Sequence, residues 1–177
     1  MKKIRCFISI DIPEEVKIRI KKIQEKLPDF FGKKTELNNL HLTLKFLGEI
    51  DEEKIEKIKE ELKKVKFNKF QTEAKHAGFF NNKKYGVIWL YLSDCENIQK
   101  AVDGQLEDLF QRERRFMSHL TIARVKKKLK DKKKFLEQLN KIKIEKINFV
   151  VDRFKLKKST LTSEGPVYET LEEYGLN

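Results

Sequence analysis

Cysteine is scarce in this sequence, and long hydrophobic runs are missing from it. The two cysteines, Cys6 and Cys95, have a separation that fits neither a metal site nor a disulfide framework. We expect reduced, buried thiols in a cytoplasmic protein. The longest apolar run, "YGVIWLYL" (85–92), is far below the length of about 20 residues that a membrane-spanning helix needs, so no membrane partner is expected. The apolar run after the basic start, "IRCFISI" (4–10), is too short for a signal peptide and predicts a strand instead.

Histidine is also rare, yet two of the three histidines begin the same short phrase. His41 opens "HLTL" (41–44) and His119 opens "HLTI" (119–122), in each case histidine, apolar residue, threonine, apolar residue. Either histidine alone is most simply a satisfied core or surface side chain. The repeated phrase requires one explanation that covers both.

Basic residues outnumber acidic ones. Forty Lys and Arg against 28 Asp and Glu give a formal net charge of +12. Such a surplus favours polyanionic partners. Lysine-rich surfaces also stabilise proteins at high temperature through networks of ion pairs, so charge alone leaves both explanations open.

The order of the predicted elements repeats along the chain. Periodicity predicts two helices between three extended segments in each half, with the histidine phrase on the middle strand. The strands are expected at 4–10, 40–48, 70–80, 85–92, 118–125 and 144–161, and the helices at 13–27, 51–65, 94–109 and around 135–139. Residues 31–39 are expected to form a loop, and 163–176 to return as an edge strand after a turn at Gly165 and Pro166.

This repeat predicts two pseudo-symmetric β-α-β-α-β lobes. We expect one domain over 1–177, with lobes at about 1–82 and 83–177 that could exchange their terminal strands. No linker separates the lobes, because "FFNNKKYG" (79–86) predicts only a turn. Symmetry would then bring the two histidine phrases together where the lobes meet.

The two phrases place the same chemistry on the same strand face. Because side chains alternate along a strand, His41 and Thr43 share one face, as do His119 and Thr121. Two imidazoles facing one cleft suit acid–base catalysis near neutral pH, and hydroxyls beside them suit an anion such as a phosphoryl group. A metal site is disfavoured, since neither phrase has a third histidine, cysteine spacing or a nearby acidic cluster. We therefore expect no metal and no other cofactor.

Arg124 follows the second phrase at an odd offset from His119. Strict alternation places its side chain on the opposite face, unless the strand twists or bulges. A solvated arginine at the strand end and a place in the active site both stay open on this reasoning.

The quoted phrases, taken with their surroundings, resemble one known family. "RCFISIDIPEE" (5–15), "LHLTLKFLGEI" (40–50), "AGFFNNKKYGVIWL" (77–90), "FMSHLTIARVK" (116–126) and "FKLKKSTLTSEGPVYETL" (154–171) are similar, in this order, to the 2H phosphoesterase superfamily. Within it they resemble the RNA 2′,3′-cyclic phosphodiesterases, also called 2′-5′ RNA ligases. The resemblance covers nearly the whole chain, although Ser118 stands where the family usually has proline.

The resemblance implies an α+β fold class, with two antiparallel sheets flanking a central cleft and helices outside. It also implies metal-independent opening of an RNA 2′,3′-cyclic phosphate to a 2′-phosphate, and ATP-independent 2′-5′ ligation as the reverse reaction. His41 would donate a proton to the departing 3′ oxygen, and His119 would activate water. Thr43, Thr121 and Arg124 would bind the phosphate. The expected partner is RNA with a cyclic phosphate end, for which tRNA fragments are one candidate, and the protein is expected to be a monomer.

Two other functions stay open at this point. One is a cyclic phosphodiesterase that acts on small nucleotides or on an ADP-ribose cyclic phosphate. The other is a non-catalytic RNA-binding module of the same fold. The basic residues that flank the phrases either hold an RNA backbone or form solvated surface; they are Lys33, Lys34, Lys45, Arg112, Arg114 and Arg115. His76 belongs to neither phrase and is given no catalytic role, and Phe79 and Trp89 are expected in the core.

Overall fold

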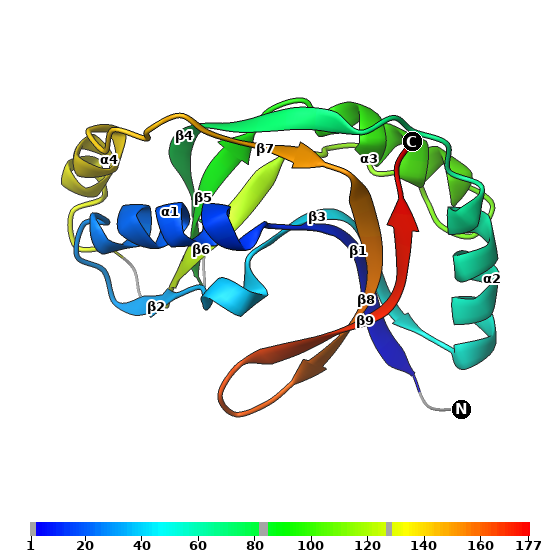
Figure 1. Ribbon diagram of the computed structural model, residues 1–177. Helices are drawn as coiled ribbons and strands as arrows, with labels where there is room; N and C mark the ends of the chain where they lie inside the picture. Colours follow the sequence, from blue (N-terminus) through cyan, green and yellow to red (C-terminus); the bar gives the residue numbers. More distant parts are fainter. Residues whose placement is uncertain (1–2, 82–84, 127–128) are drawn as a thin grey trace.

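A computed structural model describes residues 3–81, 85–126 and 129–177 of the protein (Figure 1). The elements follow the predicted order, except that the segment expected as one strand at 144–161 is divided into two strands at Asp152; the α+β class is confirmed. The strands are β1 (Ile4–Asp11), β2 (Gly32–Lys34), β3 (His41–Ile50), β4 (Phe70–Asn81), β5 (Gly86–Leu92), β6 (His119–Val125), β7 (Ile147–Val151), β8 (Arg153–Leu161) and β9 (Pro166–Gly175). The helices are α1 (Glu14–Glu25), α2 (Glu52–Lys63), α3 (Glu96–Gln105) and α4 (Lys132–Asn140), with a short 3₁₀ helix, η1 (Leu37–Asn39). Residues 82–84 of the predicted turn at 79–86 lie outside the described residues.

The strands form one curled antiparallel sheet rather than the two sheets that the resemblance implied. The strand order is β7-β4-β5-β6-β3-β1-β8-β9, with β2 added beside β6. Its two halves join where β3 meets β6, and a single residue pair, Leu42 and Leu120, makes that junction. Because only this pair joins β3 to β6, the sheet resembles two smaller sheets placed side by side. The C-terminal β9 lies at the edge, as expected.

The two halves of the sheet do not follow the order of the chain. Strand β4, from the first part of the sequence, pairs with β5 and β7, while β8, from the last part, pairs with β1. One half therefore contains β1, β3, β8 and β9, and the other contains β2, β4, β5, β6 and β7. The division of the sequence near residue 82 stays a prediction.

Two of the four helices pack against the half of the sheet that does not contain the strand before them (Figure 1). Helix α1 follows β1 but packs against β6 and β7, and α3 follows β5 but packs against β3. Helix α4 packs against β4, and α2 packs against α3 and β9. None of the helices in the described ranges is long and apolar enough to cross a membrane.

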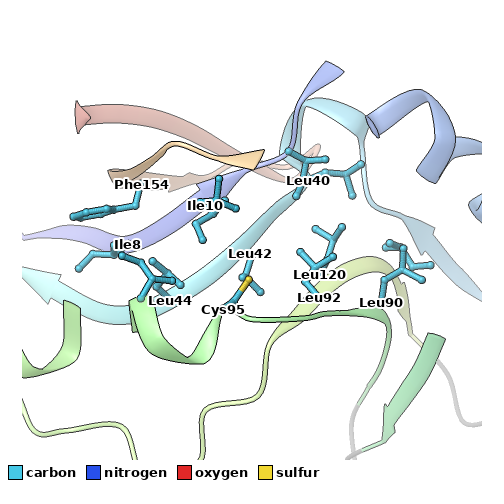
Figure 2. Packing of buried hydrophobic residues seen from close by; sticks show 14 of the residues in the cluster. Ile8, Ile10, Leu40, Leu42, Leu44, Leu90, Leu92, Cys95, Leu120 and Phe154 are labelled. Carbon is cyan, nitrogen blue, oxygen red and sulfur yellow. The ribbon is translucent and has the colours of Figure 1, made fainter. Parts of the chain in front are cut away.

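The apolar side chains of the histidine strands form the centre of the core (Figure 2). Leu42 and Leu120 have no exposed surface, and Leu44 and Ile122 are also fully buried. Their His and Thr neighbours are only half-buried. The alternation predicted from the two phrases is therefore confirmed, and burial of one face fixes which face carries the polar side chains. Phe79 and Trp89 also pack in or against the core, as expected.

The loop predicted at 31–39 contains the short strand β2 and the helix η1. Gly32, Lys33 and Lys34 pair with the end of β6, from Val125 to Ala123. The sequence "GKK" contains no β-branched or aromatic residue and so does not itself predict a strand. All three residues are exposed in the structure. Pairing with an existing strand edge organises them instead.

Candidate active site

The two histidine phrases cross at the junction of the sheet halves. Leu42 pairs with Leu120 in antiparallel register, so each histidine stands across from the threonine of the other phrase. In this register His41 and His119 occupy diagonal positions across the junction. All four polar side chains line the same cleft. The structure thus brings together His41, Thr43, His119 and Thr121 as the sequence predicted.

Each imidazole is held by the backbone two residues earlier in the chain. His41 Nδ1 lies 2.8 Å from the carbonyl oxygen of Asn39, and His119 Nδ1 lies 2.8 Å from that of Met117. Because a carbonyl can only accept a hydrogen bond, Nδ1 must be the donor in both rings. The neutral form of each histidine then carries its proton on Nδ1 and leaves the Nε2 lone pair free.

Aromatic rings support both histidines. The ring centroids of Phe7 and Tyr168 lie 4.9 and 5.0 Å from that of His41, and Phe80 meets His119 edge-on at 5.3 Å. Tyr168 belongs to β9, which reaches the cleft as part of the β8–β9 hairpin. The side-chain amide of Asn39 donates to the carbonyl oxygen of Pro166 at 3.1 Å and so ties this hairpin to the backbone that holds His41.

Burial lowers the pKa of His41 to about 4. The hydrogen bond to Asn39 and the charge of Asp11 oppose this shift, while the charges of Lys157 and Arg124 reinforce it. Asp11 is the Cα partner of His41 on β1 and is paired with Lys157 and Lys155. Burial alone would raise the pKa of Asp11, but these two lysines outweigh it and lower that pKa. In the free protein His41 is therefore neutral at pH 7.

A bulge in each histidine strand re-aims the side chains that follow it. Between Thr121 and Ala123 the pairing of β6 with β5 skips Ile122, so Ile122 and Ala123 are both buried and Arg124 turns to the cleft. This bulge explains why Arg124 faces the cleft although strict alternation places it on the opposite face; its role in the site stays a prediction. The pairing of β3 with β1 skips Leu44, which is the residue equivalent to Ile122 in the first phrase.

The bulge in β3 gives Lys45 and Phe46 the places that Ala123 and Arg124 have in β6. Lys45 is buried and pairs with Asp103 of α3, and its Nζ donates to the carbonyl oxygen of Gln111 at 2.8 Å. The suggestion that Lys45 holds RNA is therefore wrong, because the bulge directs it into the interior. Phe46 instead lies in the cleft wall.

The cleft between the halves has a volume of about 620 Å³, which lies in the range of ligand sites. Three exposed cations in its lining, Arg5, Lys34 and Arg124, have no ion-pair partner among the described residues. Lys33 also lines the cleft, but it pairs with Glu36 at 2.6 Å. An open cleft with unpaired positive charge and hydrogen-bonding hydroxyls attracts an anion.

The remaining basic residues of the prediction lie elsewhere. Arg112, Arg114 and Arg115 are not part of the cleft lining, and Arg112 pairs with Glu107. His76 stacks on Tyr91 at 5.3 Å and is likewise absent from the cleft lining. Within the parts of the chain that the structure describes, no three His, Cys, Asp or Glu side chains gather as metal ligands would.

Comparison with known proteins agrees with this geometry. The family described as LigT like Phosphoesterase matches residues 10–89 and 93–168, which include both histidine phrases. The chain belongs to this family. Among curated relatives, the RNA 2′,3′-cyclic phosphodiesterase of Methanocaldococcus jannaschii is 40% identical over 96% of this chain and 99% of its own length. That of Thermotoga maritima is 38% identical over 96% of this chain and 94% of its own.

Solved structures of LigT-type proteins share the fold. The crystal structure of E. coli LigT in its apo form superposes with a TM-score of 0.81, at 22% identity, over 100% of this chain and 99% of the other. A protein from Thermus thermophilus gives 0.77 at 24% identity over 97% of both chains. The expected family and the expectation of a phosphodiester-hydrolysing enzyme, a cyclic phosphodiesterase of the LigT type, are confirmed.

Several residues of the site were not predicted. Asn39 and Met117 act through backbone carbonyls, which leave no trace in residue type. Phe7 and Tyr168 reach His41 from strands at opposite ends of the sequence, so no local pattern joins them to it. For Tyr168, the one available signal was the expectation of a returning edge strand.

Proposed function

We propose that this protein hydrolyses RNA 2′,3′-cyclic phosphate ends to 2′-phosphates with two histidines and no metal. One observation carries the proposal: both histidines line the same cleft, and each is held through Nδ1. The Nε2 atom of each ring is therefore free to exchange a proton with a substrate in that cleft. The names of the curated relatives from M. jannaschii and T. maritima support the substrate. E. coli LigT, which has the same fold, has been crystallised with 3′-AMP and with phosphate.

The reaction needs one proton acceptor and one proton donor on opposite sides of phosphorus. In the proposed step, His119 Nε2 takes a proton from water while the water oxygen forms a bond to phosphorus. The bond from phosphorus to O3′ breaks, and His41 Nε2 gives its proton to that oxygen. The phosphate stays on O2′, and exchange with solvent returns the two histidines to their starting protonation states.

His41 must carry a proton on Nε2 to act as the donor, although it is neutral in the free protein at pH 7. An anion in the cleft favours the charged imidazolium and raises its pKa. The cyclic phosphate itself would supply this charge. Binding of substrate is therefore part of how His41 becomes an acid.

The neighbouring side chains are proposed to bind the phosphate oxygens. Thr43 and Thr121 donate hydrogen bonds without adding charge, and Arg124 offers a guanidinium that suits phosphate geometry. Run in reverse, with an RNA 5′-hydroxyl in place of water, the same groups would form a 2′-5′ bond without ATP. We further propose a cytoplasmic monomer that acts on RNA ends such as those of tRNA fragments.

The proposal is tested with an oligoribonucleotide ending in a 2′,3′-cyclic phosphate, incubated with the protein in excess EDTA. We expect complete conversion to a 2′-phosphate end, identified by its resistance to a 3′-specific phosphatase and by mass spectrometry. A 3′-phosphate product, loss of turnover in EDTA, or no turnover would contradict the proposed reaction. Equal rates on a cyclic mononucleotide would favour a small-molecule substrate over RNA.

A further inference from the structure

The outer end of the β8–β9 hairpin projects beyond the rest of the sheet (Figure 1). Strand β8 pairs with β1 only from Lys155 to Lys158, so residues 159–168 have no partner strand outside the hairpin among the described residues. Leu161 and Val167 near its tip are 68% and 56% exposed, so burial of apolar surface does not hold this end in place. Its position depends on the contacts that individual side chains make with it.

Two side chains from the segment that contains β2 and η1 donate hydrogen bonds to this projecting end. Asn39 Nδ2 lies 3.1 Å from the carbonyl oxygen of Pro166, and Lys33 Nζ lies 3.0 Å from that of Glu164. The bond from Lys33 is exposed, whereas the bond from Asn39 is partly buried. Asn39 also stands only two residues before His41, so its bond is the one that connects the hairpin to a histidine.

Asn39 contacts His41 directly and also through the hairpin. Its carbonyl oxygen accepts the hydrogen bond from His41 Nδ1 at 2.8 Å. Its side chain holds Pro166, and two residues further along β9 the ring of Tyr168 meets His41 edge-on, with the centroids 5.0 Å apart. The four residues thus form a closed circuit of contacts, in which the amide of Asn39 holds the start of β9 and Tyr168 lies against His41.

The residue equivalent to Asn39 in the second phrase cannot make such a bond. Met117 supplies the carbonyl oxygen that His119 Nδ1 contacts at 2.8 Å, but a methionine side chain has no N–H or O–H to donate. The pseudo-symmetry of the two phrases therefore holds for the backbone and breaks at this side chain. The break falls on the histidine whose pKa burial lowers to about 4, which is His41.

We propose that Asn39 is a positioning residue, which holds the β8–β9 hairpin so that Tyr168 covers His41 and makes this histidine the acid of the pair. The inference rests on the proposed function and adds to it the reason why the two histidines differ. An imidazole held by a carbonyl at one edge and covered by Tyr168 keeps one orientation toward the leaving oxygen. Shielding from water also makes its charged form a stronger acid, once the phosphate of the substrate has favoured that form.

The charged or titratable groups that act on His41 or face it come from several strands. They are Asp11 of β1, Lys157 of β8, Arg124 of β6 and the phenol of Tyr168 on β9. Burial raises the pKa of this phenol, so it is uncharged near neutral pH. Asn39→Ala removes none of these groups and keeps the backbone carbonyl, so it tests only the bond to Pro166.

The first measurement is an NMR titration of the histidine ring protons in the wild type, Asn39→Ala and Tyr168→Ala. The midpoint of His41 should rise from about 4 toward 6.5 in both variants, because water reaches a ring that is no longer covered. The His119 curve should superimpose on that of the wild type. Tyr168→Phe, which keeps the ring, should leave both curves unchanged. Asn148→Ala removes an exposed amide from β7 and is the matched control.

The second measurement is kcat on the cyclic-phosphate oligonucleotide. Asn39→Ala and Tyr168→Ala should each lower kcat by about 10- to 100-fold with little change in KM, as small misplacements of a reacting group do. The double variant should lose no more than the slower single variant, since both changes release the same contact. Asn148→Ala should keep the wild-type kcat.

Three results would overturn the inference. One is an unchanged His41 midpoint in Asn39→Ala, and another is an equal shift of the His119 curve, which would show a general loosening of the cleft. The third is a pair of losses that multiply in the double variant, because Asn39 and Tyr168 would then act separately. If Asn39→Ala does not fold, Asn39→Leu fills a similar space without a donor and gives the same test.

The titration does not depend on turnover, so it separates this inference from the proposed function. A wild type that hydrolyses no cyclic phosphate would contradict the proposed function. The contact between the hairpin and His41 would then be judged by the titration alone.

Discussion

His41 and His119 are held by the same hydrogen bond, from Nδ1 to the carbonyl oxygen two residues earlier, at 2.8 Å in both cases. The pseudo-symmetry of the fold thus extends from the strands to individual atoms. Because this bond fixes the tautomer, the neutral forms of the two rings have equivalent Nε2 atoms. In the proposed reaction, the difference between acid and base must therefore come from what surrounds each ring.

Removing either imidazole should abolish most of the activity. His41→Ala and His119→Ala should each lower kcat on a cyclic-phosphate oligonucleotide by about 10²–10⁴-fold, the usual contribution of a general acid or base. The double variant should lose little more than the weaker single variant, because both act in one step. His76→Ala, measured in the same assay, should keep wild-type kcat; an equal loss there would point to an effect on folding.

The threonine hydroxyls should matter in the transition state more than in binding. Thr43→Val and Thr121→Val remove a hydrogen-bond donor at almost constant volume and should each lower kcat by about 10²-fold or more, as loss of an oxyanion donor does. Thr43→Ser and Thr121→Ser keep the hydroxyl and should restore most of the rate. A serine variant as slow as the valine variant would argue that the methyl group, not the hydroxyl, is what the site needs.

Phosphate should raise the pKa of His41. In the free protein that pKa is about 4, since burial disfavours the charged ring. An anion near Nε2 favours the imidazolium, so an NMR titration of the His41 ring protons with inorganic phosphate should move its midpoint upward. Chloride at equal ionic strength is the control for screening. An unchanged midpoint at saturating phosphate would remove the link between substrate binding and the acid role.

The same shift predicts how stability depends on pH. The pKa of His41 is lower in the folded protein, about 4, than the 6.5 of an unperturbed histidine, so the unfolded chain binds more protons between these values. The stabilisation is therefore complete above about pH 6.5 and is lost as the pH falls through about 4. His41→Gln has no proton to bind, and its free energy of unfolding in urea should fall less than that of the wild type between pH 7 and pH 4. Parallel curves for the two proteins would contradict the shift.

Replacing only one partner of the buried ion pair Lys45–Asp103 should lower the free energy of unfolding. Asp103 also accepts a hydrogen bond from the backbone nitrogen of Glu113 at 2.8 Å, so the pair holds the segment that leads to the second histidine phrase. Lys45→Met leaves a buried carboxylate unpaired and should lower the free energy of unfolding by about 3–5 kcal/mol. Lys45→Met combined with Asp103→Leu should recover part of this loss in urea unfolding. If the loss in the double variant equals the sum of the losses measured for Lys45→Met and Asp103→Leu separately, the two groups are not coupled.

Sequence patterns predicted the parts of the fold that depend on local periodicity. Alternation along "HLTL" and "HLTI" predicted which face of each strand is buried, because a strand with one covered face has a fixed register. Apolar residues at helical spacing predicted α1 to α4, because each helix also buries one face. The pairing of β4 with β7 and of β8 with β1 has no local signal, since these strands lie far apart in the sequence and pair through edges that are free when the halves meet.

The polar residues of the candidate site were predicted from the sequence, whereas the residues that surround them were not. His41, Thr43, His119 and Thr121 repeat in type and spacing, so a single sequence reveals them. The bulges that direct Arg124 into the cleft and Lys45 away from it depend on pairing with β5 and β1, and residue type alone does not encode them. Phe46, which lines the cleft, was missed for the same reason, because alternation without the bulge places it on the face opposite to His41.

The pairing of β1 with β8 has a consequence for the newly made chain. At the usual rate of protein synthesis, on the order of 10 s pass between release of β1 and release of β8. During that interval one edge of β1 lacks its final partner, and an uncovered strand edge is prone to pair with other chains. The wall that Tyr168 adds beside His41 is made later still, so the cleft is complete only after synthesis has passed β9.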